Sequence, residues 1–202
     1  MVGIRQFDEE RLLQRAEGLF RAKGFDATSM TDLAAASGVQ RGSLYNAFGD
    51  KEELFLRSFA RYEARFLAAA QEALAIEDPR AALTAFLDTA IDNMTAAPTG
   101  RGCLTTRMAM EARHASARIQ DGLRHLLSQL EATLHAALCR PAAAGRLAVS
   151  PEQAARLLVV FTRGLAVLER LDTAPDILRA DARAVVDLIA PARAGEVDLR
   201  AI

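Results

Sequence analysis

The chain has 202 residues, of which 51% are hydrophobic, 25% charged and 5% aromatic, and its formal net charge is −1. This composition excludes an intrinsically disordered chain and is typical of a folded protein with a hydrophobic core. The charge balance gives no indication of a nucleic-acid partner, because residues 1–60 carry 8 basic and 9 acidic groups and residues 61–202 carry 17 of each.

Strong helix formers dominate the sequence, with 42 Ala and 27 Leu against 9 Val and 7 Ile, which predicts an all-α protein. Cys103 and Cys139 are too few and too far apart for a disulfide framework or a metal knuckle, which favours a reducing compartment. No segment resembles a secretory signal or approaches the roughly 18 uncharged residues of a membrane span. We therefore expect a cytoplasmic protein with no membrane partner, no metal and no other cofactor.

Capping signals divide the first 50 residues into three short helices. Gly24 is placed to end the first helix as a C-cap, and Gly38 is placed to end the second. Ser29 and Asp32 have the spacing of a capping box that opens the second helix. The expected helices span residues 8–23, 29–37 and 41–48.

A second capping signal, Asp50 with Glu53, opens a long fourth helix that carries an aromatic stripe at helical spacing. We interpret this stripe as core rather than as ligand contact; its members are Phe55, Phe59, Tyr62 and Phe66. Prolines suited to a first helical turn and further breakers predict five more helices, for about nine in all. These five begin near residues 79, 102, 116, 151 and 175.

The second and third expected helices have the pattern of a helix-turn-helix. Ala34 allows the two helices to cross closely, Gly38 can adopt the left-handed conformation that the turn needs, and Leu33, Val39 and Leu44 can fill the wedge between the helices. Two short helices in this arrangement place the second helix in the major groove of DNA.

A larger set of residues across positions 5–60 resembles the head of the tetracycline-repressor (TetR) family. The set comprises Leu12, Leu13, Ala16, Leu19, Phe20, Gly24, Phe25, Thr28, Asp32–Ala34, Gly38–Val39, Gly42–Tyr45, Phe48, Lys51 and Leu54. The resemblance implies a three-helix DNA-binding head at residues 1–60, with the motif at 29–48. It also implies a helical ligand-binding and dimerisation bundle at residues 61–202.

The resemblance also implies roles for residues of the head. Tyr45 and Lys51 would hold phosphates, Lys51 from a helix N-terminus that itself favours anions, and Thr28 and Ser29 would approach the DNA backbone. Arginine can pair with guanine and asparagine with adenine, so the exposed face of the third helix supplies the candidate base-reading residues. These are Gln40, Arg41, Gly42, Ser43 and Asn46. Gln40 departs from the family pattern, which often has a capping Ser or Thr there.

In this family the effector cavity lies among the fourth to eighth helices, and most apolar candidates there are expected to be ordinary core. Arg107 would favour an anionic effector if it points inward. We interpret Cys103 first as a small buried hydrophobic residue. The alternative is a reactive thiol at a helix N-terminus. The candidate pocket residues are Phe66, Phe86, Asn93, Met94, Cys103, Thr106, Arg107, Met110 and Phe161.

The last two expected helices are apolar over more than one stripe, which indicates a subunit interface. The candidate interface residues are Leu158, Leu165, Leu168, Leu178, Val185 and Leu188. We do not expect an enzyme, because no catalytic constellation is present.

The resemblance predicts a ligand-responsive transcriptional repressor. As a homodimer it would bind a palindromic operator in double-stranded DNA, and a small-molecule effector would release it. The alternatives are an activator of the same fold and a helical ligand-binding or scaffold dimer without DNA function.

Overall fold

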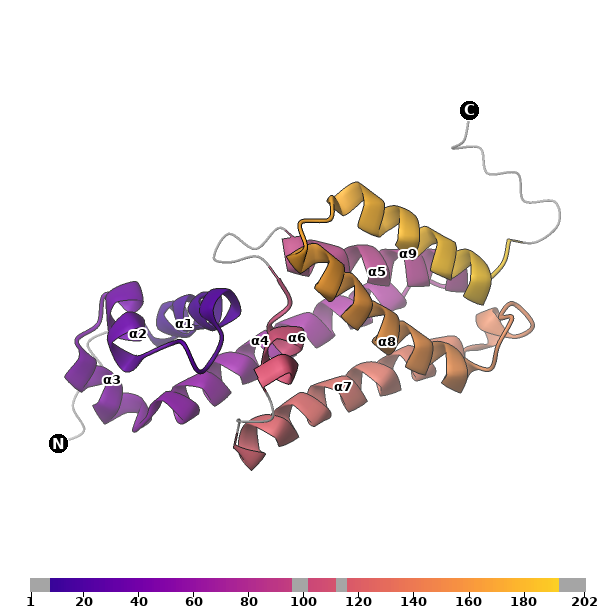
Figure 1. The fold of residues 1–202 in the computed structure, drawn as a ribbon. Helices are drawn as coiled ribbons and strands as arrows, with labels where there is room; N and C mark the ends of the chain where they lie inside the picture. The colour runs from indigo at the N-terminus through magenta and orange to yellow at the C-terminus, as the bar shows by residue number, and fades with distance from the viewer. Residues whose placement is uncertain (1–7, 96–101, 112–115, 193–202) are drawn as a thin grey trace.

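The computed structural model describes residues 8–95, 102–111 and 116–192, and helices joined by turns and loops make up this part of the chain (Figure 1). It forms nine α-helices, as the sequence predicts, and one short 3-10 helix. The helices are α1 (Glu9–Lys23), α2 (Met30–Ser37), α3 (Arg41–Phe48), α4 (Lys51–Leu74), α5 (Pro79–Thr95), α6 (Leu104–Glu111), α7 (Ala117–Leu138), α8 (Pro151–Arg170) and α9 (Pro175–Ile189), with the 3-10 helix η1 at Pro141–Ala143.

Helices α1, α2 and α3 form the head, and the predicted caps fix its turns. The Ser29 side chain accepts from the backbone N–H of Asp32, whose carboxylate accepts from the backbone N–H of Ser29, so the capping box is confirmed. Gly24 ends α1 at φ +87° and Gly38 ends α2 in the left-handed conformation at φ +70°. α3 follows within three residues of Gly38, which gives the short turn of a helix-turn-helix.

The 24-residue helix α4 joins the head to the body, which comprises α5–α9 (Figure 1). The boundary that we expect at residue 60 falls inside this helix, so both parts of the molecule share it. The aromatic stripe of α4 is buried, as predicted, and Phe55 packs edge-on against Phe20 of α1 at 5.1 Å between ring centroids. Successive rings along α4 continue this packing to Phe66, so one core extends from the head into the body.

In the body, α5 packs between α4 and α9, and α7 packs against both α4 and α8. The short helix α6 lies near the middle of the molecule, where it contacts α1, α7 and α8 (Figure 1). None of the helices in the described part of the chain combines the length and the apolar character that crossing a bilayer requires.

Candidate nucleic-acid interface and effector site

Helix α3 buries one face and exposes the other. Leu44 and Phe48 point into the core of the head, with exposed fractions of 0% and 4%. Most of the predicted base-reading residues lie on the exposed side, and Ser43 is half-buried. The exposed residues are Gln40, Arg41, Gly42, Tyr45 and Asn46. The side chain of Gln40 forms no capping hydrogen bond, in line with its departure from the family pattern.

Arg41 and Tyr45 lie one helical turn apart on this exposed face and contact each other. The Nη2 group of Arg41 donates to the hydroxyl oxygen of Tyr45 at 3.3 Å, and the guanidinium carbon lies 5.4 Å from the centre of the Tyr45 ring. The contact holds a cation and a hydroxyl together on the exposed face of α3, where both side chains are accessible.

Lys51 is held at the N-terminus of α4 by the turn that follows α1. Its Nζ donates to the carbonyl oxygen of Phe25 at 2.8 Å and lies 4.2 Å from the centre of the Phe25 ring. A lysine ammonium has three donors. The bond to Phe25 therefore leaves donors for a phosphate while it fixes where the charge sits.

Thr28 does not occupy the predicted position of a DNA contact. Its side chain is buried, with 1% exposed, and its hydroxyl donates to the carbonyl oxygen of Gly24. Thr28 therefore closes the turn after α1. Ser29 is exposed, but its hydroxyl is engaged in the capping box with Asp32.

Arginines offset the acidic residues around the start of α4. Arg118 of α7 pairs with Glu52 at 3.5 Å and with Glu53 at 2.9 Å. Hydrogen bonds from Arg118 and Arg57 lower the pKa of Glu53 below its usual value. These ion pairs partly neutralise Glu52 and Glu53, and so reduce the negative potential next to Lys51 that would repel a phosphate.

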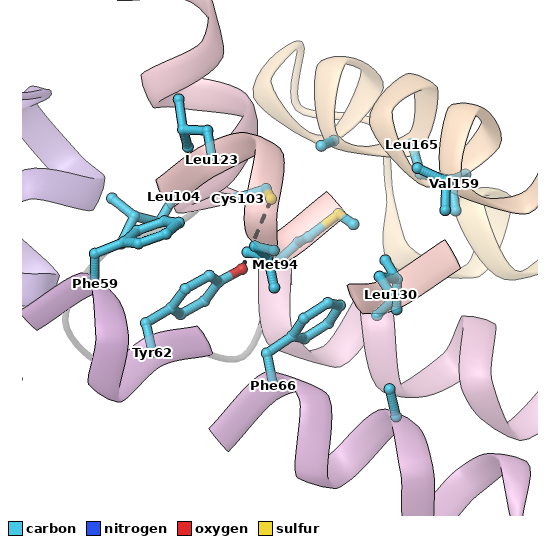
Figure 2. Close-up of a cluster of buried hydrophobic side chains, with 14 of the residues drawn as sticks. Phe59, Tyr62, Phe66, Met94, Cys103, Leu104, Leu123, Leu130, Val159 and Leu165 are labelled. Carbon is cyan, nitrogen blue, oxygen red and sulfur yellow. Dashed lines mark hydrogen bonds between the residues drawn. The ribbon is translucent and has the colours of Figure 1, made fainter. Parts of the chain in front are cut away.

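Polar groups meet around the hydroxyl of the buried Tyr62, which points towards the sulfur atom of the buried Cys103 (Figure 2). Two half-buried side chains, Asn93 and Arg163, complete the group. Asn93 of α5 donates to this hydroxyl at 3.2 Å, and the Sγ atom of Cys103 lies 3.9 Å from it. Arg163 of α8 brings its Nη1 group within 3.7 Å of the same sulfur atom. We call Tyr62, Asn93, Cys103 and Arg163 the polar cluster.

Burial and charge act on the two ionisable groups at the centre of this cluster. Burial raises the pKa of Tyr62, so its hydroxyl stays protonated. Burial also raises the pKa of Cys103, but the Arg163 guanidinium and hydrogen bonds from Thr106 and Tyr62 outweigh it, and the net pKa is lowered. A buried thiol beside a cation is therefore the chemically distinctive feature of the body.

The structure gathers part of the predicted pocket around the polar cluster. Phe66, Met94 and Cys103 lie together there (Figure 2), Asn93 contacts Tyr62, and Thr106 contacts Cys103. Phe86 is buried and Phe161 is half-buried against the same core.

Two predicted pocket residues point elsewhere. Arg107 reaches away from the polar cluster and donates to the carbonyl oxygen of Lys23 in the head, so it does not supply the inward cation. Met110 is 70% exposed. Both predictions are corrected, because the docking of α6 on α1 turns this face of α6 towards the head and solvent.

Arg163 supplies the cation of the polar cluster. It is not among the pocket residues predicted from the sequence. It follows the buried Val159 by four residues and precedes the buried Ala166 by three. A charged residue at helical spacing within an apolar face was the signal that could have identified it. Tyr62 was recognised only as part of the aromatic stripe.

The candidate interface residues of α8 and α9 divide into two groups. Leu158, Leu165 and Leu178 are buried within the chain's own core. They are therefore corrected to core positions. Leu168 and Leu188 are exposed and Val185 is half-buried. Further large apolar side chains are exposed on these two helices and at the C-cap of α8: Leu157, Val160, Val167, Leu171 and Ile177.

Comparisons with known proteins agree with this architecture. Residues 12–57 match the family described as "Bacterial regulatory proteins, tetR family", and residues 79–185 match "Tetracyclin repressor-like, C-terminal domain". The HTH-type transcriptional repressor ComR of Escherichia coli (strain K12) is 31% identical over 143 residues, which cover 70% of this chain and 68% of ComR.

Two solved structures illustrate the shared fold. A cysteine mutant of the TetR family regulator CifR, complexed with 26-bp operator DNA, superposes with a TM-score of 0.81 at 24% identity and covers 93% of this chain and 99% of its own. The reduced form of E. coli NemR gives 0.80 at 23% identity, with 92% and 98% covered. With both of its regions matched, the chain belongs to the TetR family of transcriptional regulators.

Proposed function

We propose that this protein is a ligand-responsive transcriptional repressor that binds a palindromic operator as a homodimer and is released by a small molecule. The exposed face of α3 carries the proposal, because it presents Arg41 and Asn46 free of the core. Side chains of these types recognise guanine and adenine in the major groove. Tyr45, which contacts Arg41, and Lys51 at the start of α4 would bind phosphates, which position the helix without specifying sequence. This role places the protein in the cytoplasm.

The exposed apolar surface of α8 and α9 supports the homodimer. It includes Val160, Leu168, Leu171 and Leu188, whose burial needs a second apolar surface. A twofold dimer would present two copies of α3, separated by about 34 Å for half-sites one helical turn apart. The operator would accordingly be a palindrome.

The polar cluster supports an effector site in the body. Polar side chains in an apolar core can orient a small ligand, and here Arg163 would favour an effector with an electron-rich or anionic group. Effector binding would stabilise a separation of the two heads that no longer fits the operator.

The name of ComR, a transcriptional repressor, supports repression, and CifR provides an example of the fold on operator DNA. Activation and a ligand-binding role without DNA remain the competing functions. Reporter expression after deletion of the gene separates repression from activation, since loss of a repressor raises expression of its target.

The direct test is selection of genomic DNA fragments by the purified protein, with Tyr45→Ala and Tyr45→Phe as matched variants. We expect the wild-type protein to enrich a palindrome and Tyr45→Ala to lose that enrichment. Tyr45→Phe retains the ring beneath Arg41 and removes only the hydroxyl, so it separates packing from the phosphate contact. Enrichment of no sequence by the wild-type protein would contradict the proposal.

A further inference from the structure

A pair of charged residues on α6 binds the main chain of the head. The Oε2 atom of Glu111 accepts from the backbone N–H of Phe25 at 2.8 Å and from that of Asp26 at 3.4 Å. Arg107 donates through Nη2 to the carbonyl oxygen of Lys23. Its Nε donates to Oε1 of Glu111 at 3.0 Å, so the two side chains support each other. We call Arg107, Glu111 and the turn at residues 23–26 the latch.

The absence of a side chain at Gly24 permits this close contact. A Cβ atom at Gly24 would lie 1.9 Å from Oε1 of Glu111 and 2.9 Å from Nε of Arg107. Arg107 also satisfies the carbonyl oxygen of Lys23 at the C-terminus of α1, where the last carbonyls of a helix have no partner within the helix. The turn thus leaves room for the two side chains of α6, and Arg107 provides the donor that the last carbonyl of α1 lacks.

The residue that Glu111 holds is the same residue that holds Lys51. The backbone N–H of Phe25 binds Glu111, and its carbonyl oxygen binds Nζ of Lys51. The Phe25 ring also packs edge-on against Phe55 at 5.5 Å between centroids. Phe25 thus connects α6 of the body to the ammonium group at the start of α4.

We propose that the latch positions the head, and Lys51 in particular, for operator binding, so that Arg107 and Glu111 are positioning residues for a DNA contact that they do not make. This inference rests on the proposed function. With the latch intact, the turn that anchors Lys51 has one location relative to the body. Without it, that turn must be ordered each time DNA binds, and this ordering opposes binding.

The test compares Glu111→Ala with Glu152→Ala. Glu152 forms an ion pair with Arg156 at the same spacing of four residues, but on the exposed surface of α8. Operator affinity is measured by fluorescence anisotropy on the selected fragment, and amide hydrogen exchange is measured at Phe25 and Asp26. We expect Glu111→Ala to bind about 5- to 150-fold more weakly and to exchange both amides faster. We expect Glu152→Ala to stay within about twofold of wild type.

A double variant distinguishes positioning from a general loss of structure. If the latch acts through Lys51, the losses caused by Glu111→Ala and Lys51→Ala combine to less than their product. Losses that multiply fully would overturn the inference, as would unchanged affinity in Glu111→Ala. If Glu111→Ala does not fold, Glu111→Gln provides the same comparison, because it keeps one acceptor oxygen and loses the charge. Lack of selective DNA binding by the wild-type protein would instead overturn the proposed function itself.

Discussion

Glu17 of α1 links the head to α4 through ion pairs with two arginines of that helix. Its side chain is 7% exposed and binds Arg21 at 3.1 Å, Arg65 at 2.7 Å and Arg61 at 3.3 Å. The Glu17→Gln substitution keeps the size of the side chain but removes the only charge that these contacts share. It also turns an amide group with two donors towards guanidinium groups that can only donate.

The cost of this substitution follows from the burial of its partners. Breaking a buried ion pair costs about 3–5 kcal/mol, and we expect about 3 kcal/mol because Arg61 and Arg65 are partly exposed and therefore screened. For a chain of this size, that loss lowers the midpoint of thermal unfolding by about 6–12 °C.

The assay is urea and thermal unfolding followed by circular dichroism at one fixed protein concentration, since the proposed dimerisation would couple stability to concentration. The matched control is Glu152→Gln, because the pair of Glu152 with Arg156 is exposed. We expect that control to change the free energy of unfolding by less than about 0.5 kcal/mol. Equal stability of Glu17→Gln and the control would refute the reasoning that Glu17 anchors the head.

Three other predictions concern DNA binding, assembly and pH. Lys51→Ala should weaken binding to all DNA sequences and reduce the slope of log K against log salt concentration by about 0.9 per protomer. Arg41→Ala should instead cost about 1–3 kcal/mol of binding free energy and relax the choice of sequence. Anisotropy titrations check both variants, and the reverse pattern would mean that Arg41 binds phosphate and Lys51 reads a base. Leu168→Glu should give monomers by light scattering while Ile76→Glu, exposed on the loop after α4, stays dimeric; a dimeric Leu168→Glu would place the interface elsewhere. Burial raises the pKa of Glu63, so the ionisation of this carboxyl opposes folding at neutral pH. Glu63→Gln should therefore increase the free energy of unfolding at pH 7, and this increase should vanish as the pH falls below about 4. Urea unfolding at both pH values checks this, and an equal increase at the two would contradict it.

The local features of the head could be predicted from the sequence because each depends on residues close together in the chain. The capping box at Ser29 and the glycine turns at Gly24 and Gly38 require only local hydrogen bonds and backbone angles. The burial of the aromatic stripe on α4 follows from helical spacing. These features were sufficient to predict the helix-turn-helix and its exposed face.

The features that the sequence could not supply depend on how helices dock. α8 is apolar on several sides, so periodicity could not tell that Leu158 faces the chain's own core while Leu168 faces outward. The direction of Arg107 depends on the contact between α6 and α1, which are separated by some 80 residues. The hydrogen bond from Thr28 to Gly24 is instead local, but the capping signals do not specify the path of the turn that buries Thr28.

The central claim, that two copies of α3 read a specific DNA sequence, is tested most directly by titrating the selected fragment and a shuffled fragment of equal length with the wild-type protein. The titrations are made at about 50 and 200 mM salt. We predict two protomers per selected site, a preference of at least about 10³-fold over the shuffled fragment, and weaker binding to both at the higher salt concentration. Equal affinity for the two fragments would contradict the claim.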